Sequence, residues 1–247
     1  LEFRRVLFRS ALSPGLSNGA VIWAVDAEGN SYVTDDATNH LKSLDICGNV
    51  RWDQAINQAV YGAVLAEQAL IIERAGIVEA RDSATGQATW SVDVANLSGF
   101  CDGGPCGNAL QGTIYEGPPV YTNQGQLIIT TVHQGPPYHL VLTSLTKEGY
   151  FLWSKQGSQI AATMGGANEI ADMEGNVYTY TLGTFASFLE IYSPHGVLKA
   201  QRPSFAQTNL AASANYVVDL GENPNVALSP SGNPVFTISQ TIVQSPQ

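Results

Sequence analysis

An internal repeat constrains this chain more than any other feature: a glycine is followed four positions later by a tryptophan. The pattern occurs at Gly48–Trp52, Gly86–Trp90 and Gly149–Trp153, and a fourth copy at Gly196 has Ala200 in place of the tryptophan. Each copy follows an apolar stretch and a polar turn, which is typical of a hairpin inside a larger β unit.

A second signature precedes each of these by about twenty residues and consists of a glycine turn followed by alternating apolar residues. It occurs at 26–34, 122–130, 172–180 and 229–237, and at 65–73 in a degraded form in which Gln68 replaces the glycine. Each unit therefore reads as strand, turn, strand, loop, strand, turn, strand. We place the units at residues 19–55, 58–95, 116–156, 166–202 and 224–247.

This order predicts an all-β chain of four-stranded antiparallel meanders, because no helical 3.6-residue pattern of useful length is present. Successive sheets bury both of their faces when they stack about a common axis. We therefore predict a β-propeller that is incomplete, with about four blades and part of a fifth.

The quoted segments also resemble a known family. PPVYTNQGQLIIT (118–130) and ARDSATGQATW (80–90) are similar to the pyrroloquinoline-quinone-like, or quinoprotein-type, propeller repeat. The resemblance covers roughly residues 19–240 and implies a fold rather than an activity, since such repeats serve enzymes and binding scaffolds alike. Rings of this family have seven or eight blades, so it also implies that the chain is part of a larger protein.

The resemblance gives the repeated tryptophans a structural role. In the family this residue wedges between neighbouring blades, and we carry that role to Trp52, Trp90 and Trp153. The alternative is an aromatic shelf for a ligand. Regular recurrence favours packing, because an aromatic side chain buries a large area.

The first ten residues, LEFRRVLFRS, differ in charge from the rest of the chain. They contain three arginines and one glutamate, a net +2, whereas the whole chain has −10, which leaves −12 for residues 11–247. Reverse translation gives a sequence that looks like a sequencing adapter read in frame, so we interpret residues 1–10 as an artefact and residues 11–247 as the domain. A short basic arm is the alternative.

The geometry of a meander sorts its connections. The first and third turns lie at one end of each sheet, and the second turn and the link to the next sheet lie at the other. The glycine turns therefore share a tight-turn face, and the longer segments 35–40, 96–117, 133–139 and 210–225 share a loop-rich face. Because variable loops carry function in repeat folds, we predict binding there, with candidate residues Asp35, Asp36, Asn39, Arg74, His133 and Tyr138.

Metal binding at this face is not favoured. Asp35, Asp36 and Asn39 offer oxygen atoms to calcium, but without EF-hand spacing an exposed polar turn is the better interpretation. His133 and His139 flank Gly-Pro-Pro-Tyr without neighbouring carboxylates, so solvated loop histidines are favoured over metal ligands. We predict no metal site.

The cysteines suggest an oxidising compartment. Cys101 and Cys106 are separated by Asp-Gly-Gly-Pro, a turn sequence that favours a local disulfide over two free thiols or a zinc site. Cys47 lies in a third-turn region and is expected to be unpaired and partly buried.

Two functions remain open. Strong acidity argues against nucleic acid, no apolar run is long enough to span a membrane, and no phosphate loop, nucleophile elbow or HExxH motif is present. We predict a non-catalytic, extracytoplasmic scaffold that binds a protein or small molecule without a cofactor. The alternative is a fragment of an alcohol or sugar dehydrogenase that uses pyrroloquinoline quinone and calcium. Alcohol-oxidising members of that family carry an adjacent Cys-Cys disulfide, whereas Cys101 and Cys106 are not adjacent.

Overall fold

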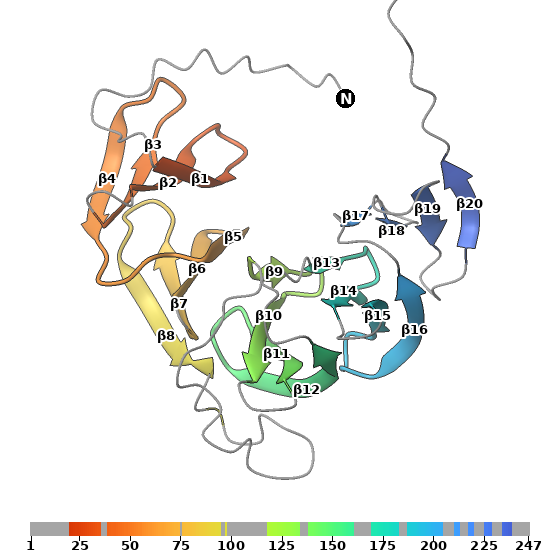
Figure 1. Ribbon diagram of the computed structural model, residues 1–247. Coiled ribbons are helices and arrows are strands. Elements are labelled where there is room, and N and C mark those ends of the chain that lie inside the picture. The colour runs from red at the N-terminus through yellow and green to blue at the C-terminus, as the bar shows by residue number, and fades with distance from the viewer. Residues whose placement is uncertain are drawn as a thin grey trace, which may run out of the picture.

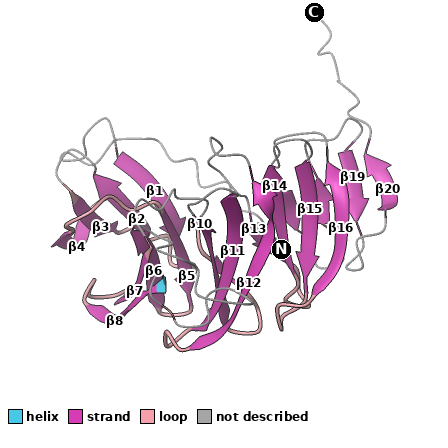
Figure 2. Cartoon of the chain, turned by 60° about the horizontal axis from the view of Figure 1, so that its bottom comes forward, coloured by secondary structure: helices cyan, strands magenta, loops and turns pink. Residues whose placement is uncertain are grey.

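The computed structural model describes residues 20–35, 39–74, 76–94, 97, 118–133, 138–160, 169–182, 187–204, 210–212, 217–219, 225–228 and 234–238. These residues form five four-stranded antiparallel sheets, each made of strands that are consecutive in the chain. The sheets follow one another around an open arc, with the first strand of each on the inside and the fourth on the outside (Figure 1). Figure 2 shows the sheets from the side, standing next to each other.

The first three sheets contain strands β1 to β12. The first sheet consists of β1 (Ala20–Val25), β2 (Ser31–Asp35), β3 (His40–Leu44) and β4 (Val50–Ala55). The second consists of β5 (Gly62–Ala66), β6 (Ala69–Arg74), β7 (Ile77–Asp82) and β8 (Ala88–Asp93). The third consists of β9 (Val120–Tyr121), β10 (Gln126–His133), β11 (Tyr138–Thr146) and β12 (Phe151–Ile160).

The last two sheets contain strands β13 to β20. The fourth consists of β13 (Glu169–Ala171), β14 (Val177–Leu182), β15 (Ser187–Tyr192) and β16 (Leu198–Ser204). The fifth consists of β17 (Leu210–Ala212), β18 (Val217–Asp219), β19 (Asn225–Leu228) and β20 (Pro234–Ile238). The predicted all-β meander architecture is confirmed.

Most of the tight turns combine a glycine with a side chain that accepts hydrogen bonds from the backbone of the turn. Between β1 and β2, Gly29 N donates to Asp26 O (3.1 Å) and Asn30 N donates to Asp26 Oδ1 (2.7 Å). Gly29 has φ 85°, a left-handed conformation that favours glycine. The β5–β6 turn lacks this glycine and is a shorter, two-residue turn in which Glu67 takes the positive φ of 55°.

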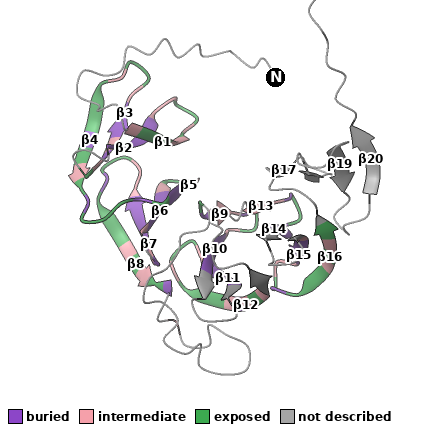
Figure 3. Ribbon diagram, viewed as in Figure 1, coloured by how far each residue is buried: buried purple, intermediate pink, exposed green. Residues whose placement is uncertain are grey.

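The hydrophobic core consists of layers between neighbouring sheets. Tyr32 and Leu41 pack against Leu70 and Ile72 of the second sheet, and Ile71, between those two residues on β6, packs toward the third sheet. Because alternate residues of a strand point to opposite faces, β6 contributes to both layers. Figure 3 shows this burial on the middle strands β2, β6 and β7, while the outer strands β4 and β8 are largely exposed.

The repeated tryptophans lie at the junctions between sheets. Trp52 Nε1 donates to Ser83 O of the second sheet (3.0 Å). The indole also covers Gly86, where an added Cβ would lie 2.6 Å from the ring. The repeat therefore has two linked parts: a glycine that leaves room for a ring, and a tryptophan that fills the room on the next sheet.

The same contact occurs at the next two junctions. Trp90 Nε1 donates to Lys147 O (3.0 Å) and covers Gly149. Trp153 Nε1 donates to Pro194 O (2.8 Å), and the ring covers Gly196. We call each glycine-containing turn that receives an indole a docking turn.

The structure differs from three of the sequence-based expectations. The segment 210–225, expected to be a loop, contains β17 and β18, so residues 229–233 stand between the third and fourth strands of their sheet rather than between the first and second. First and third turns share the same glycine signal, and the sequence has Phe236 where the third turns of the first three sheets are followed by a tryptophan. Cys47 is exposed rather than partly buried, because it lies at the tip of the β3–β4 turn, where its N–H binds Asp45 Oδ1 (2.8 Å).

Candidate functional site

The predicted binding residues lie at the same end of three neighbouring sheets. Asp35 ends β2, Arg74 ends β6 and His133 ends β10, while Tyr138 begins β11. These strands occupy equivalent places in their sheets, so their ends share the loop-rich face. Asn39 precedes β3 at this face and has a positive φ of 52°. Asp36, Cys101 and Cys106 fall outside the described residues.

Asp35 and Arg74 both interact within their own sheets. Asp35 is buried and its carboxylate lies 3.7 Å from Lys42 Nζ. Arg74 pairs with Glu79, and the same carboxylate pairs with Arg81. Arg81 in turn donates to Gly86 O (2.9 Å) in the turn that receives Trp52. This arginine–glutamate–arginine cluster lies on the side of the second sheet that packs against the first.

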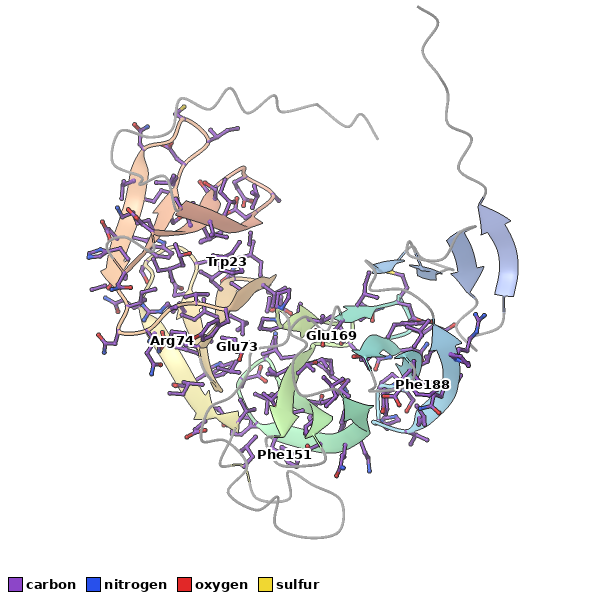
Figure 4. The ribbon with its side chains drawn as sticks, in the orientation of Figure 1. Trp23, Glu73, Arg74, Phe151, Glu169 and Phe188 are labelled. Carbon is purple, nitrogen blue, oxygen red and sulfur yellow. The ribbon has the colours of Figure 1, made fainter. Side chains whose placement is uncertain are left out.

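Glu73, the neighbour of Arg74, is a buried carboxyl group at the loop-rich end. Its side chain is 1% exposed and its Oε2 has no hydrogen-bond partner. Burial raises the pKa of Glu73 to about 7, although a backbone hydrogen bond from Gly76 acts in the opposite direction. Figure 4 shows Glu73 and Arg74 together at the end of β6.

Close packing of the third sheet helps to bury this end of β6. Gly62 pairs with Glu73 in the β5–β6 register. A Cβ on Gly62 would lie 2.4 Å from Pro118 Cα and 2.9 Å from Pro119 Cδ. The chain leading into β9 therefore lies directly against the second sheet, and only a glycine fits at position 62.

The sequence analysis did not find a hollow on the opposite, tight-turn face. It has a volume of about 640 Å³ and lies where three turns of the first two sheets meet. Four carboxylate-bearing residues line it: Asp26, Glu28, Glu67 and Asp82. Its volume is within the range of ligand sites, which is about 300–1,000 Å³.

Hydrogen bonds lower the pKa of two of these carboxyl groups, Asp26 and Asp82. Burial acts to raise the pKa of Asp26, but hydrogen bonds from Asn30 and Tyr32, with the charge of Arg51, lower it overall. The pKa of Asp82 is lowered by hydrogen bonds from the hydroxyl and backbone N–H of Thr85.

The pKa of Glu67 is also lowered, and here the hydrogen-bond donor carries a positive charge. A hydrogen bond from Lys147, whose Nζ lies 2.7 Å from Glu67 Oε2, and the charge of that lysine lower the pKa of Glu67. The hollow is therefore negatively charged at neutral pH.

Few oxygen ligands for calcium lie on the described inner strands near the centre of the arc. The described inner strands β1, β5, β9 and β13 contain one carboxylate, Glu169, which Figure 4 labels on β13. Calcium takes six to eight oxygen ligands, usually with several carboxylates. No group of three His, Cys, Asp or Glu residues that could hold a metal ion occurs within the described part of the chain.

No protein-family model and no curated protein matches the sequence. Among solved structures, the chain is similar to a quinohemoprotein alcohol dehydrogenase from Comamonas testosteroni, with 14% identity and a TM-score of 0.61. That match covers 89% of this chain and 43% of the dehydrogenase. The chain is an incomplete β-propeller.

Two other propellers match as well. Streptogramin B lyase shares 10% identity over 91% of this chain and 70% of its own, with a TM-score of 0.61. Regucalcin from Agrobacterium tumefaciens, a calcium-binding protein, shares 13% identity over 89% of this chain and 74% of its own, with a TM-score of 0.51. These proteins differ in what they do, so the likeness concerns the fold. In the described part of the chain, no helix is long and apolar enough to cross a membrane.

The hollow could have been found only in part from the sequence. Asp26 and Asp82 each open a glycine turn, so their place on the tight-turn face follows from the repeat. Their approach to Glu67 across the first two sheets depends on how the sheets stack, which no local pattern encodes.

Proposed function

We propose that this protein is a non-catalytic binding scaffold that takes a cationic group of a protein or small-molecule ligand into the hollow on its tight-turn face. The observation that carries the proposal is the hollow itself, about 640 Å³ in volume and lined by four carboxylate-bearing residues. Charge of one sign in a cleft attracts oppositely charged partners and raises their local concentration.

The state of these carboxyl groups supports binding rather than proton transfer. General acid–base catalysis works best with a pKa near the operating pH. Asp26, Glu67 and Asp82 have pKa values below their usual range, so they remain charged at neutral pH. Glu28 is exposed at the rim and adds charge where a ligand would enter.

The proposal extends to location and to the second face. We place the protein outside the cytoplasm, because the spacing of Cys101 and Cys106 favours a disulfide. A further contact at the loop-rich face, near His133 and Tyr138, stays a prediction from the sequence.

A labelled pentalysine peptide tests the charge of the hollow. We expect saturable binding that weakens with salt and that falls about fivefold in Glu28→Lys, because a charge is reversed at the rim. Glu174→Lys is the matched control, since Glu174 is an exposed carboxylate in the β13–β14 turn, on a sheet that does not line the hollow. Equal losses in the two variants, or no binding by the wild-type protein, would refute the proposal.

A second titration separates the scaffold from the dehydrogenase. The protein is mixed with pyrroloquinoline quinone and calcium, and dye-linked alcohol oxidation is recorded. Saturable quinone binding with turnover would contradict a non-catalytic scaffold, whatever the pentalysine result.

A further inference from the structure

The buried carboxyl group of Glu73 differs in its partners from the other buried carboxyl groups of the described residues. Each of the others has a cationic or hydrogen-bond-donating side chain as a partner: Asp35, Glu79, Asp172 and Glu190. Within the described part of the chain, Glu73 accepts a hydrogen bond only from the backbone N–H of Gly76, and its Oε2 has no hydrogen-bond partner. A carboxyl group in this position is favoured as the neutral acid, because burial penalises the charged form.

Glu73 faces the third sheet. Ile71, two residues earlier on β6, packs in one cluster with Ile129 of β10. Because side chains alternate along a strand, Glu73 and Thr131 continue these two facing surfaces toward the loop-rich end. Thr131 is 1% exposed, its hydroxyl has no hydrogen-bond partner, and it pairs with Val141 of β11. The described side chains that face Glu73 from the third sheet are therefore uncharged.

The second sheet supplies no charge on this face either. Glu73 pairs with Gly62 on one side and with Val78 on the other. The arginine–glutamate–arginine cluster lies on the opposite side of the sheet, against the first sheet. On β10 and β11 the nearest titratable residues are His133 and His139, which pair with each other nearer the loop-rich end. Among the described side chains, none that faces Glu73 carries a positive charge that could replace its proton.

The junction between the second and third sheets is held differently at its two ends. At the tight-turn end, Lys147 Nζ lies 2.7 Å from Glu67 Oε2, and the Tyr121 hydroxyl donates to Glu67 Oε1 (3.2 Å). At the loop-rich end, the chain leading into β9 lies against Gly62, a close contact between uncharged groups. The loop-rich ends can therefore separate while the tight-turn ends stay joined.

We propose that Glu73 makes the contact between the second and third sheets depend on pH: the neutral carboxyl keeps their loop-rich ends together, and transfer of its proton to water lets these ends separate. The charged form has no cation or side-chain donor while it stays buried, whereas water solvates it once the sheets separate. This contact lies at the opposite face from the hollow, so the proposal does not depend on cation binding there.

Hydrogen exchange of backbone amides tests the proposal. The N–H of Tyr61 donates to Glu73 O (2.9 Å) and reports on the loop-rich end, whereas the amides of β15 report on the core of the fourth sheet. After correction for the intrinsic effect of pH on exchange, the opening constant at Tyr61 is expected to rise about fiftyfold between pH 5 and pH 8. It should stay constant in Glu73→Gln, which has no proton to lose. Glu148→Gln, at an exposed position, is the control and should behave as the wild type.

The dependence on urea separates a local opening from unfolding of the whole protein. A local opening exposes little surface, so exchange at Tyr61 should be faster than exchange in β15 and insensitive to low concentrations of urea. Equal rates with equal urea dependence at the two places would mean that proton loss only weakens the whole fold, and would overturn the proposal. A pH response at Tyr61 that persists in Glu73→Gln would overturn it as well.

Gly62→Ala provides a second test at the contact itself. The added Cβ would lie 2.4 Å from Pro118 Cα, so the loop-rich ends cannot close fully and water reaches Glu73 at every pH. We expect exchange at Tyr61 to be fast already at pH 5 and to rise less than about fivefold up to pH 8. Slow exchange at pH 5 with the full rise of the wild type would contradict a closed contact at Gly62. If this variant does not fold, the comparison of the wild type with Glu73→Gln decides the question alone.

Discussion

Replacing Glu73 with glutamine is expected to stabilise this protein at neutral and alkaline pH. The buried carboxyl has a pKa of about 7, against a usual value of 4.5. Between these values the unfolded chain has released the proton while the folded protein still holds it. The free energy of unfolding therefore falls as pH rises through this interval, and the whole decrease has occurred above pH 7. At about 1.4 kcal/mol for each pH unit, the loss amounts to about 3 kcal/mol.

The glutamine variant is neutral at every pH and keeps a carbonyl that can accept the hydrogen bond from Gly76. Urea unfolding at a series of pH values measures the effect. We expect the wild-type free energy of unfolding to fall by about 3 kcal/mol between pH 4.5 and pH 8 relative to Glu73→Gln. Glu148→Gln, at an exposed turn, is the control and should follow the wild type.

Other carboxyl groups titrate in a different interval. The lowered pKa values of Asp26, Asp45 and Asp82 stabilise the fold above pH 4, and that stability is lost as pH falls through their folded-state values. These groups do not change the pH dependence of the free energy of unfolding between pH 4.5 and pH 7. Parallel curves for the wild type and Glu73→Gln across that interval would show that Glu73 is ionised in the fold.

Substitutions at three further positions test the junctions between sheets by denaturant unfolding. Trp153→Phe removes the hydrogen bond to Pro194 O and should cost about 1 kcal/mol, whereas Trp153→Ala should cost about 3–5 kcal/mol; equal costs would contradict the separate contribution of the N–H. Glu79→Gln leaves two buried arginines without their counter-charge and should cost about 3–5 kcal/mol, and an unchanged midpoint would refute that pairing. Gly149→Ala places a Cβ 2.9 Å from the Trp90 ring at φ 86°, so we expect a loss above about 1 kcal/mol; a neutral result would show that the ring moves aside.

The strand order could be predicted from the sequence because the repeat consists of signals between residues that are close in the chain. A glycine at each turn and alternating apolar residues along each strand are properties of neighbouring residues, so they can be recognised without a structure. The fifth sheet was placed too late because the glycine-containing sequence between β19 and β20 has the same local signal as a first turn. Phe236, four residues after that glycine, is the signal that could have corrected the assignment.

The candidate sites were harder to predict because they depend on contacts between sheets. Arg74 looked like a binding residue, yet β7 places Glu79 against it. The loop-rich face was favoured because its segments are long, whereas the described hollow lies among short turns. Its carboxylates belong to segments far apart in the chain, and only stacking of the first two sheets unites them.

The spacing of the Gly-to-Trp repeat did not reveal which residues are in contact. The two residues lie in one hairpin, and their spacing does not say which glycine receives which tryptophan. In the structure, the glycine of one sheet receives the tryptophan of the sheet before it, so the hairpins of the second and third sheets each take part in two junctions. Stability then depends on pairs of neighbouring sheets. Ala200 interrupts this series, so the junction between the fourth and fifth sheets lacks the ring that the three earlier junctions have.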